Sequence, residues 1–253
     1  MDLGLKGLRA VVTGGTRGIG LSIAQTLAAE GCSVAICSRN DADAKAAADK
    51  LAAYGVPTLG KGVDVADGAA LSGWVGETAA SFGGLDIVIA NVSALSIGND
   101  EDSWKKGFDV DIMGTVRLVD AAIPFLEKSA AASIVTISSV SGREIDFAAG
   151  PYGAFKAALI HYTQGLAYNL ASKRIRANTV SPGNTYFEGG VWNQIENGNP
   201  ELFSDSLALN PTGRMATPQE IANAVTFLAS PAASFIYGTN LVVDGALTRG
   251  VQL

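Results

Sequence analysis

The chain has 253 residues, of which 48% are hydrophobic and 17% charged, and its formal net charge is -6. This composition is typical of a folded chain with a large buried core and argues against disorder. Basic residues are scattered, and we find neither a signal-peptide pattern nor an apolar run of bilayer length, so we expect a cytoplasmic protein without nucleic-acid or membrane partners.

Short apolar runs alternate with helical patterns along the whole chain. This alternation is typical of βαβ units, which build a parallel sheet with helices on both faces. We expect strands at 8–13, 33–37, 58–63, 86–90, 133–138, 176–180 and 240–243. We expect helices at 19–29, 42–53, 68–82, 103–127, 151–172 and 218–229. No linker-like or repetitive tract interrupts this order, so the sequence predicts a single doubly wound α/β domain.

A glycine-rich turn joins the first strand to the first helix, with the sequence Thr13-Gly14-Gly15-Thr16-Arg17-Gly18-Ile19-Gly20. Glycines in such a turn let a pyrophosphate approach the backbone, and the helix N-terminus attracts the phosphate charge. A glycine pattern alone is weak evidence and also suits an ordinary turn. Its place between first strand and first helix makes dinucleotide binding the stronger interpretation.

The second strand ends without the carboxylate that would bind the adenosine ribose of NAD. It carries Ser38 and Arg39 instead, and Arg17 in the glycine turn adds a second cation. Guanidinium groups suit a 2'-phosphate, so we favour NADP(H), with NAD(H) as the alternative. Asp41 and Asp43 follow closely, but acidic residues also belong at the start of a helix.

Cysteine and histidine are rare, and this limits the chemistry. Cys32 and Cys37 lie just before and within the second strand, and we expect both to be free and buried. His161 is the only histidine. We expect it to be a packed helix residue, and we expect neither a metal site nor a histidine-based triad.

Three residues form the candidate catalytic group. Tyr152 and Lys156 are four residues apart at the start of a helix, so their side chains share a face, and Ser139 ends the fifth strand. Ligands of such sheets bind beyond the carboxyl ends of the strands, where the three side chains can meet. A nearby cation favours the ionised phenol, so Tyr152 would transfer a proton while Lys156 assists it and Ser139 binds the carbonyl oxygen.

Tyr-x-x-x-Lys alone also arises by chance as a surface pair on a helix. Joined to the glycine turn and the upstream serine, it resembles the short-chain dehydrogenase/reductase family over nearly the whole chain. The supporting matches are Asn91, Ser181-Pro182-Gly183, Asn210-Pro211-x-Gly213-Arg214, Tyr237-Gly238 and Val243-Asp244-Gly245. Within the family, the sequence is most similar to the bacterial 3-oxoacyl-carrier-protein reductase group.

The resemblance implies one NAD(P)-binding Rossmann domain over residues 1–253, with a seven-stranded parallel sheet, usually in a tetramer. It also implies NAD(P)-dependent carbonyl reduction or alcohol oxidation. Asp64 after the third strand would meet the adenine amino group, although a turn aspartate is the other interpretation. The residues expected to bind the cofactor are Gly14, Thr16, Arg17, Gly18, Ile19, Gly20, Ser38, Arg39, Asp64, Val65, Asn91, Tyr152, Lys156, Pro182, Gly183 and Thr185.

The sequence departs from the family pattern in two places. Ala90-Asn91-Val92-Ser93 keeps one asparagine of the family motif but adds side chains where small residues let the cofactor lie close. Asp111 replaces the asparagine that ties a water to the catalytic lysine. Its charge would pair with Lys156 and weaken the effect of Lys156 on Tyr152, so we expect lower or pH-shifted activity.

The stretch at 183–213 is expected to be an irregular substrate lid, because it combines glycine, asparagine and proline with aromatic residues. Phe187, Trp192 and Phe203 would build an apolar pocket for a small or medium ketone or secondary alcohol; the other interpretation is that they only pack the lid. The helix at 151–172 is apolar on more than one face, which predicts a homo-oligomer, at least a dimer.

Two alternatives stay beside the NADP-dependent oxidoreductase. One is a secondary alcohol dehydrogenase that uses NAD. The other is a nucleotide-binding sensor that has kept the fold and lost turnover, which Asp111 and Val92-Ser93 favour and the retained Ser139, Tyr152 and Lys156 oppose.

Overall fold

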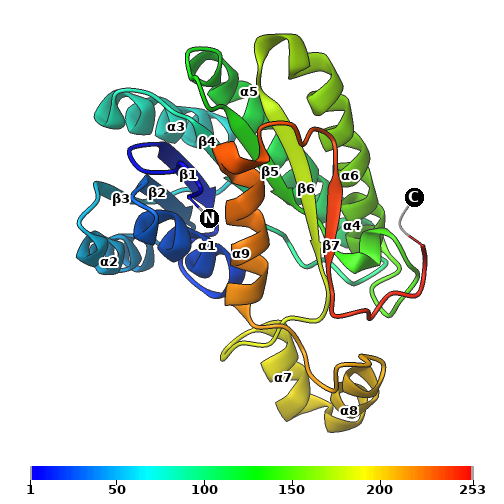
Figure 1. Cartoon of the computed structure of the whole chain (residues 1–253). Coiled ribbons are helices and arrows are strands. Elements are labelled where there is room, and N and C mark those ends of the chain that lie inside the picture. The colour runs from blue at the N-terminus through cyan, green and yellow to red at the C-terminus, as the bar shows by residue number, and fades with distance from the viewer. Residues whose placement is uncertain (1, 252–253) are drawn as a thin grey trace.

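The computed structural model describes residues 2–251, and a parallel sheet of seven strands forms its centre (Figure 1). The strand order is β3-β2-β1-β4-β5-β6-β7, and all neighbouring strands are parallel. The strands are β1 (Arg9–Thr13), β2 (Ser33–Ser38), β3 (Thr58–Gly62), β4 (Ile87–Ala90), β5 (Ser133–Ile137), β6 (Arg176–Pro182) and β7 (Asn240–Val243). The predicted Rossmann-like sheet is confirmed, and every expected strand is present within two residues of its expected ends.

Helices connect the strands and cover both faces of the sheet. They are α1 (Gly18–Ala29), α2 (Asp41–Leu51), α3 (Gly68–Phe82), α4 (Glu101–Gly107), α5 (Gly114–Leu126), α6 (Pro151–Leu170), α7 (Val191–Gly198), α8 (Pro200–Ala208) and α9 (Pro218–Ala229). Short 3-10 turns lie at Ala52–Tyr54, Val140–Gly142, Ala171–Lys173 and Pro231–Ala233. A π-helical turn, Phe108–Met113, joins α4 to α5.

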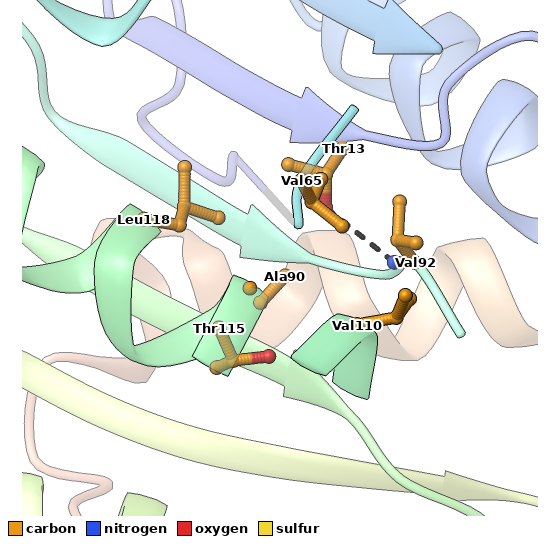
Figure 2. A pocket seen from close by; sticks show the side chains of 8 residues that line it. Thr13, Val65, Ala90, Val92, Val110, Thr115 and Leu118 are labelled. Atoms are coloured by element: carbon orange, nitrogen blue, oxygen red, sulfur yellow. Dashed lines mark hydrogen bonds between the residues drawn. The ribbon is translucent and has the colours of Figure 1, made fainter. Parts of the chain in front are cut away.

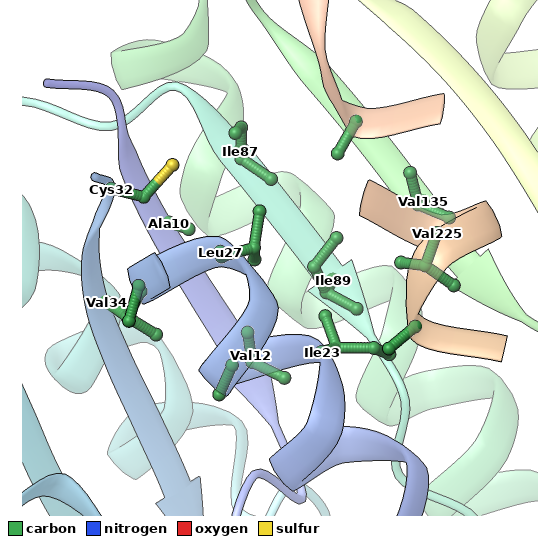
Figure 3. Packing of buried hydrophobic residues seen from close by; sticks show 14 of the residues in the cluster. Ala10, Val12, Ile23, Leu27, Cys32, Val34, Ile87, Ile89, Val135 and Val225 are labelled. Atoms are coloured by element: carbon green, nitrogen blue, oxygen red, sulfur yellow. The ribbon is translucent and has the colours of Figure 1, made fainter. Parts of the chain in front are cut away.

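Two apolar layers lie on opposite faces of the sheet. Side chains alternate between the faces of a strand, so Ala10 and Val12 join the layer beneath α1, α2 and α9, and Val11 joins the layer beneath α3, α5 and α6. Figure 3 shows the first layer, in which Ile23 and Leu27 of α1 pack on β1, β2 and β4. Because both faces are covered, the strands leave only their carboxyl ends and the following loops for chemistry.

The span expected at 103–127 is helical through residue 126, and the π-helical turn lies within it. Two other expectations about helices are wrong. The stretch 183–213 is not irregular throughout, because it contains α7 and α8, and Asn199 caps α8 through its side chain. His161 is exposed rather than packed, since α6 turns Leu159 and Thr163 toward the sheet.

Cys32 and Cys37 are free and buried, as expected, and burial raises the pKa of each thiol to about 12. Across residues 2–251, no helix has both the length and the apolar character needed to cross a membrane.

Candidate active site

The loops after β1, β4, β5 and β6 all leave the same edge of the sheet. Parallel strands bring their carboxyl ends to one edge, so residues far apart in the sequence become neighbours there. Figure 1 shows α7 and α8 beyond this edge, after the carboxyl end of β6. The predicted catalytic and cofactor-binding residues are therefore arranged along one edge of the molecule.

The glycine turn has backbone angles and surroundings that exclude most side chains. Gly14 and Gly18 have positive φ angles of 66° and 52°. A Cβ added at Gly20 would collide with the carbonyl of Gly14. Asn91, after β4, holds the turn, since its Nδ2 donates to Thr13 O at 3.0 Å. No side chain of the described residues caps the N-terminus of α1, whereas α2, α3 and α9 are each capped by a side chain.

Phe187 contacts this turn from the lid, a position that the sequence did not indicate. A Cβ added at Gly18 would overlap the ring of Phe187, and a Cβ at Gly190 would lie 2.8 Å from the same ring. Thr185, which was expected to bind cofactor, follows the carboxyl end of β6: its hydroxyl donates to Gly183 O at 3.0 Å, and its backbone bridges to Ala216.

A small apolar pocket lies beside the turn, between β1, β4 and α5. It is lined by Thr13, Val65, Ala90, Val92, Val110, Gly114, Thr115 and Leu118 (Figure 2). Val92, one of the two departures from the family motif, contributes its side chain to this wall, and its backbone N–H donates to the Thr13 hydroxyl at 3.4 Å. Asp64 is exposed next to Val65 and accepts a hydrogen bond from Ala66 N.

Two exposed guanidinium groups follow β1 and β2. Neither Arg17 nor Arg39 forms an ion pair with a described residue. Asp41, in contrast, is occupied: it pairs with Lys45 at 2.6 Å and accepts a hydrogen bond from Gly62 N at 2.8 Å. Asp41 and Asp43 both lie in the first turn of α2, as the helix-start interpretation predicted.

Tyr152 and Lys156 share a face at the start of α6, as predicted. The ammonium nitrogen of Lys156 lies 5.7 Å from the centroid of the Tyr152 ring and donates to Ile137 O at 2.9 Å. The lysine side chain is only 2% exposed. A cation so deeply buried needs a compensating charge.

Asp111 supplies that charge. Its Oδ1 lies 3.4 Å from Lys156 Nζ, and its Oδ2 accepts a hydrogen bond from Ala94 N at 2.8 Å. The contact between Asp111 Oδ1 and Lys156 is an ion pair by distance, but it is not aligned as a hydrogen bond. Asp111 belongs to the π-helical turn, a distortion that occurs frequently at functional sites.

Ser139 follows β5 and begins a short chain of hydrogen bonds. Its Oγ lies 3.2 Å from Ser141 Oγ and also accepts from Ser141 N. Ser141 Oγ donates to Asp146 Oδ2 at 2.6 Å, and Ala148 N donates to Asp146 Oδ1. The sequence reasoning missed Ser141 and Asp146, because they belong to a loop without a regular pattern.

The aromatic residues of the lid do not form one cluster. Trp192 is buried and meets Phe147 edge to face, with ring centroids 5.7 Å apart. Phe203 pairs with Tyr186 inside the lid, and Phe187 lies on the glycine turn. Only Trp192 therefore joins the lid to the loop that follows the candidate catalytic serine.

Comparison with known proteins places this arrangement in a wider group. The family model described as enoyl-(acyl carrier protein) reductase matches residues 14–248. Isoepoxydon dehydrogenase patN of Penicillium expansum is 38% identical over 260 residues, which span 100% of this chain and 99% of that protein. The 3-oxoacyl-[acyl-carrier-protein] reductase FabG of Escherichia coli K12 is 34% identical, over 97% of this chain and 99% of its own.

A solved structure agrees with these matches. A short-chain dehydrogenase from Burkholderia cenocepacia J2315, in complex with NADP, superposes with a TM-score of 0.86. The two sequences are 31% identical, and the match covers 96% of this chain and 99% of the other.

Proposed function

The chain belongs to the short-chain dehydrogenase/reductase family of oxidoreductases, and from that premise we propose that it interconverts a ketone and a secondary alcohol with NADP(H). One observation supports this proposal most: buried Lys156 lies beside Tyr152 at the start of α6, next to the carboxyl end of β5, where Ser139 follows. These are the acid–base and carbonyl-binding groups that such a reaction requires.

The glycine turn fits a dinucleotide. Gly14, Gly18 and Gly20 place no side chain between the backbone of the turn and a bound ligand. The free N–H groups at the N-terminus of α1 point to the same turn. When bound, the nicotinamide cofactor supplies or takes up the hydride. Asn91 holds the turn, while Asp64, Val65, Pro182 and Gly183 lie along the same edge of the sheet.

Arg17 and Arg39 favour NADP(H) over NAD(H). Both guanidinium groups are exposed, and neither forms an ion pair with a described residue. Both are therefore available to a 2'-phosphate. The nearby Asp41 already forms an ion pair with Lys45 and accepts a hydrogen bond from Gly62 N. It is therefore poorly placed to accept hydrogen bonds from the hydroxyl groups of an NAD ribose. The NADP complex of the Burkholderia relative agrees with this preference.

Tyr152 transfers the proton in this proposal. In reduction its hydroxyl gives a proton to the carbonyl oxygen, and in oxidation it takes one from the alcohol. Lys156 stabilises the resulting phenolate, since opposite charges attract and its ammonium nitrogen lies 5.7 Å from the centre of the tyrosine ring. Ser139 donates a hydrogen bond to the substrate oxygen and orients it.

Lys156 has three N–H donors, and one of them forms a hydrogen bond to Ile137 O. Asp111 Oδ1 lies 3.4 Å from the ammonium nitrogen but is not aligned with an N–H donor. The other two donors would be available to the tyrosine oxygen and to the cofactor ribose. Lys156 thus links the tyrosine to the bound cofactor in the proposed site.

The substrate in this proposal is small or medium in size and largely apolar. The lid at 183–213 would close over it, because Trp192 meets Phe147 of the loop after Ser139. Rings at this contact supply an apolar wall.

The Asp111 ion pair supports a second candidate, a nucleotide-binding sensor with weak or no turnover. A carboxylate 3.4 Å from Lys156 Nζ offsets part of the positive charge that Tyr152 requires. A sensor would bind NADPH and leave every substrate unchanged.

We extend the proposal to the assembly: the exposed face of α6 lies against a second copy, within a homotetramer. Ala154, Ala157, Ala158 and Tyr168 are exposed there, and Tyr168 is 86% exposed. Analytical ultracentrifugation of the wild type and of Tyr168→Asp tests this extension. We expect the variant to dissociate, and a monomeric wild type would contradict the extension.

The experiment that tests the catalytic proposal is cofactor consumption by the purified protein. NADPH and NADH are supplied in parallel with acetoacetyl esters, aromatic ketones and cyclic ketones, and cofactor affinity is measured by fluorescence. We expect turnover with NADPH. NADPH binding without any turnover would support the sensor instead, and failure to bind either cofactor would contradict both candidates.

A further inference from the structure

Ser141 and Asp146 form a polar pair directly beside Ser139. Ser139 Oγ and Ser141 Oγ are 3.2 Å apart, and Ser141 Oγ lies 2.6 Å from Asp146 Oδ2. The reaction proposed above requires Ser139, Tyr152 and Lys156, but it does not require this pair. We therefore asked what the pair can recognise.

Its position is set by packing against the start of α6. A Cβ added at Gly153 would lie 2.9 Å from Ser141 O and 3.1 Å from Ala148 O, and Gly153 N donates to Ala148 O. Gly153 follows Tyr152 in the chain. The loop that carries Ser141 and Asp146 is thereby held next to the residue that transfers the proton.

The same loop also meets the lid. Phe147 follows Asp146 and packs edge to face on Trp192 of α7. The Ser141–Asp146 pair thus lies in a loop between Ser139, the N-terminus of α6 and the lid. A substrate whose carbonyl oxygen reaches Ser139 brings its neighbouring atoms to this loop.

The hydrogen-bond directions within the chain are fixed by the carboxylate. An ionised Asp146 can only accept, so Ser141 gives its single proton to Asp146. Ser139 must then be the donor in its contact with Ser141. In this arrangement the proton of Ser139 is directed at Ser141.

Substrate binding changes this arrangement. When Ser139 turns its proton to a substrate carbonyl, Ser141 Oγ loses its donor and keeps an open lone pair beside the carbonyl. Ser141 is half-buried, so an acceptor left without a donor there carries a cost, whereas a donor on the substrate would satisfy it. A hydroxyl on the carbon next to the carbonyl lies at a suitable distance, because oxygens on neighbouring carbons have a separation similar to that of the two serine oxygens.

Resting on the function proposed above, we propose that Ser141 and Asp146 select substrates with a hydroxyl group next to the reacting carbonyl. The substrate class is then α-hydroxy ketones and, in the oxidative direction, vicinal diols. The hydroxyl donates to Ser141 Oγ, and Asp146 holds Ser141 as an acceptor. The rest of the substrate remains apolar and faces Trp192 and Phe147.

The test uses matched ketones that differ by one hydroxyl group. NADPH oxidation is measured with 2-hydroxycyclohexanone against cyclohexanone, and with 3-hydroxy-2-butanone against 2-butanone. We expect wild-type kcat/KM to favour each hydroxy ketone by about 10-fold or more, because a site built to bind a hydroxyl rejects analogues that lack it.

Variants separate recognition from a structural role of the loop. Ser141→Ala is expected to bring both ratios close to one through a higher KM for the hydroxy ketones, with little change for the plain ketones. Asp146→Asn keeps the size of the side chain and is expected to lower the ratios partly. Glu144→Gln is the matched control, since Glu144 is an exposed carboxylate of the same loop, and its ratios should equal those of the wild type.

Three results would overturn the inference. Wild-type ratios within twofold of one would do so, as would ratios that Ser141→Ala leaves unchanged. A loss of kcat shared equally by both members of a pair would mean that Ser141 and Asp146 only hold the loop. Turnover of the plain ketones in those cases still supports the proposed function, whereas no turnover of any of the four ketones counts against the function itself, and the inference falls with it.

Discussion

The ammonium nitrogen of Lys156 lies 3.4 Å from Oδ1 of Asp111, and both side chains are almost fully buried. Neither group could be buried as a lone charge at acceptable cost. Asp111 also accepts a hydrogen bond from Ala94 N, and Lys156 donates one to Ile137 O, so a backbone group holds each member of the pair. The sequence predicted this pairing from the replacement of an asparagine, and the structure confirms it.

Removing the charge of Asp111 is expected to move the pH profile. In Asp111→Asn, Lys156 is no longer partly neutralised, so the phenolate of Tyr152 is stabilised more strongly. We expect the pH profile of alcohol oxidation to move to lower pH than in the wild type, because less of the lysine charge is offset. Steady-state kcat across pH measures the change.

The control for this prediction is Asp109→Asn. Asp109 lies in the same π-helical turn, but it is exposed. Identical pH profiles for Asp111→Asn and the wild type would contradict the coupling of Asp111 to Tyr152.

Tyr152→Phe removes the proposed proton donor and leaves the ring. We expect kcat to fall by about 10²- to 10⁴-fold, which is the usual size of an acid–base contribution. NADPH affinity should stay close to that of the wild type, because Lys156 keeps its contacts to Ile137 O and Asp111. Fluorescence titration together with kinetics checks both parts, and full activity in the variant would exclude the role given to Tyr152.

Arg39→Asp is expected to reverse the cofactor preference. A carboxylate at the end of β2 repels a 2'-phosphate and accepts hydrogen bonds from a ribose. We expect kcat/KM for NADPH to fall by about 10- to 100-fold while that for NADH is kept or rises, because each lost charge-assisted contact costs about 1.5–3 kcal/mol.

Arg174→Asp serves as the control for this substitution. Arg174 is an exposed arginine close to the amino end of β6, far from the nucleotide turn, and its positive φ of 58° suits aspartate. Equal losses with both cofactors in Arg39→Asp would argue against a phosphate contact.

Asp86→Asn tests stability away from the active site. Asp86 lies before β4 and binds Arg9 of β1 through both oxygens, at 2.7 and 2.8 Å. Burial alone would raise the pKa of Asp86, but hydrogen bonds from Arg9 and Ser129 lower it below its ordinary value. We expect the substitution to cost about 2–3 kcal/mol at neutral pH without changing KM.

The sign of the pH dependence follows from the lowered pKa. The stabilisation is fully present above the ordinary aspartate pKa near 4 and is lost as the pH falls through the lower folded-state value. Denaturant unfolding should therefore show a difference between Asp86→Asn and the wild type that is constant above about pH 5 and shrinks below about pH 4. A difference that grows on acidification would contradict this assignment.

The sequence by itself determined the architecture and the central group of side chains. Strands buried on both faces need uninterrupted short apolar runs, and the turn before α1 needs glycines at Gly14 and Gly18, so both features are visible as local patterns. The four-residue spacing of Tyr152 and Lys156 likewise fixes a shared helix face without knowledge of the rest of the fold. The place of Asp41 at a helix start was also predictable, because acidic residues are preferred in the first turn of a helix.

Only the tertiary structure decided which loop residues meet. Phe187 reaches Gly18, Ser141 reaches Ser139 and Asp146 reaches Ser141, through loops whose paths depend on packing against α6 and the lid. The exposure of His161 also depends on how α6 turns against the sheet. The periodicity of apolar residues shows which face of a helix or strand is buried. The path of an irregular loop is set instead by contacts between distant segments, and such contacts produce no periodic pattern in the sequence.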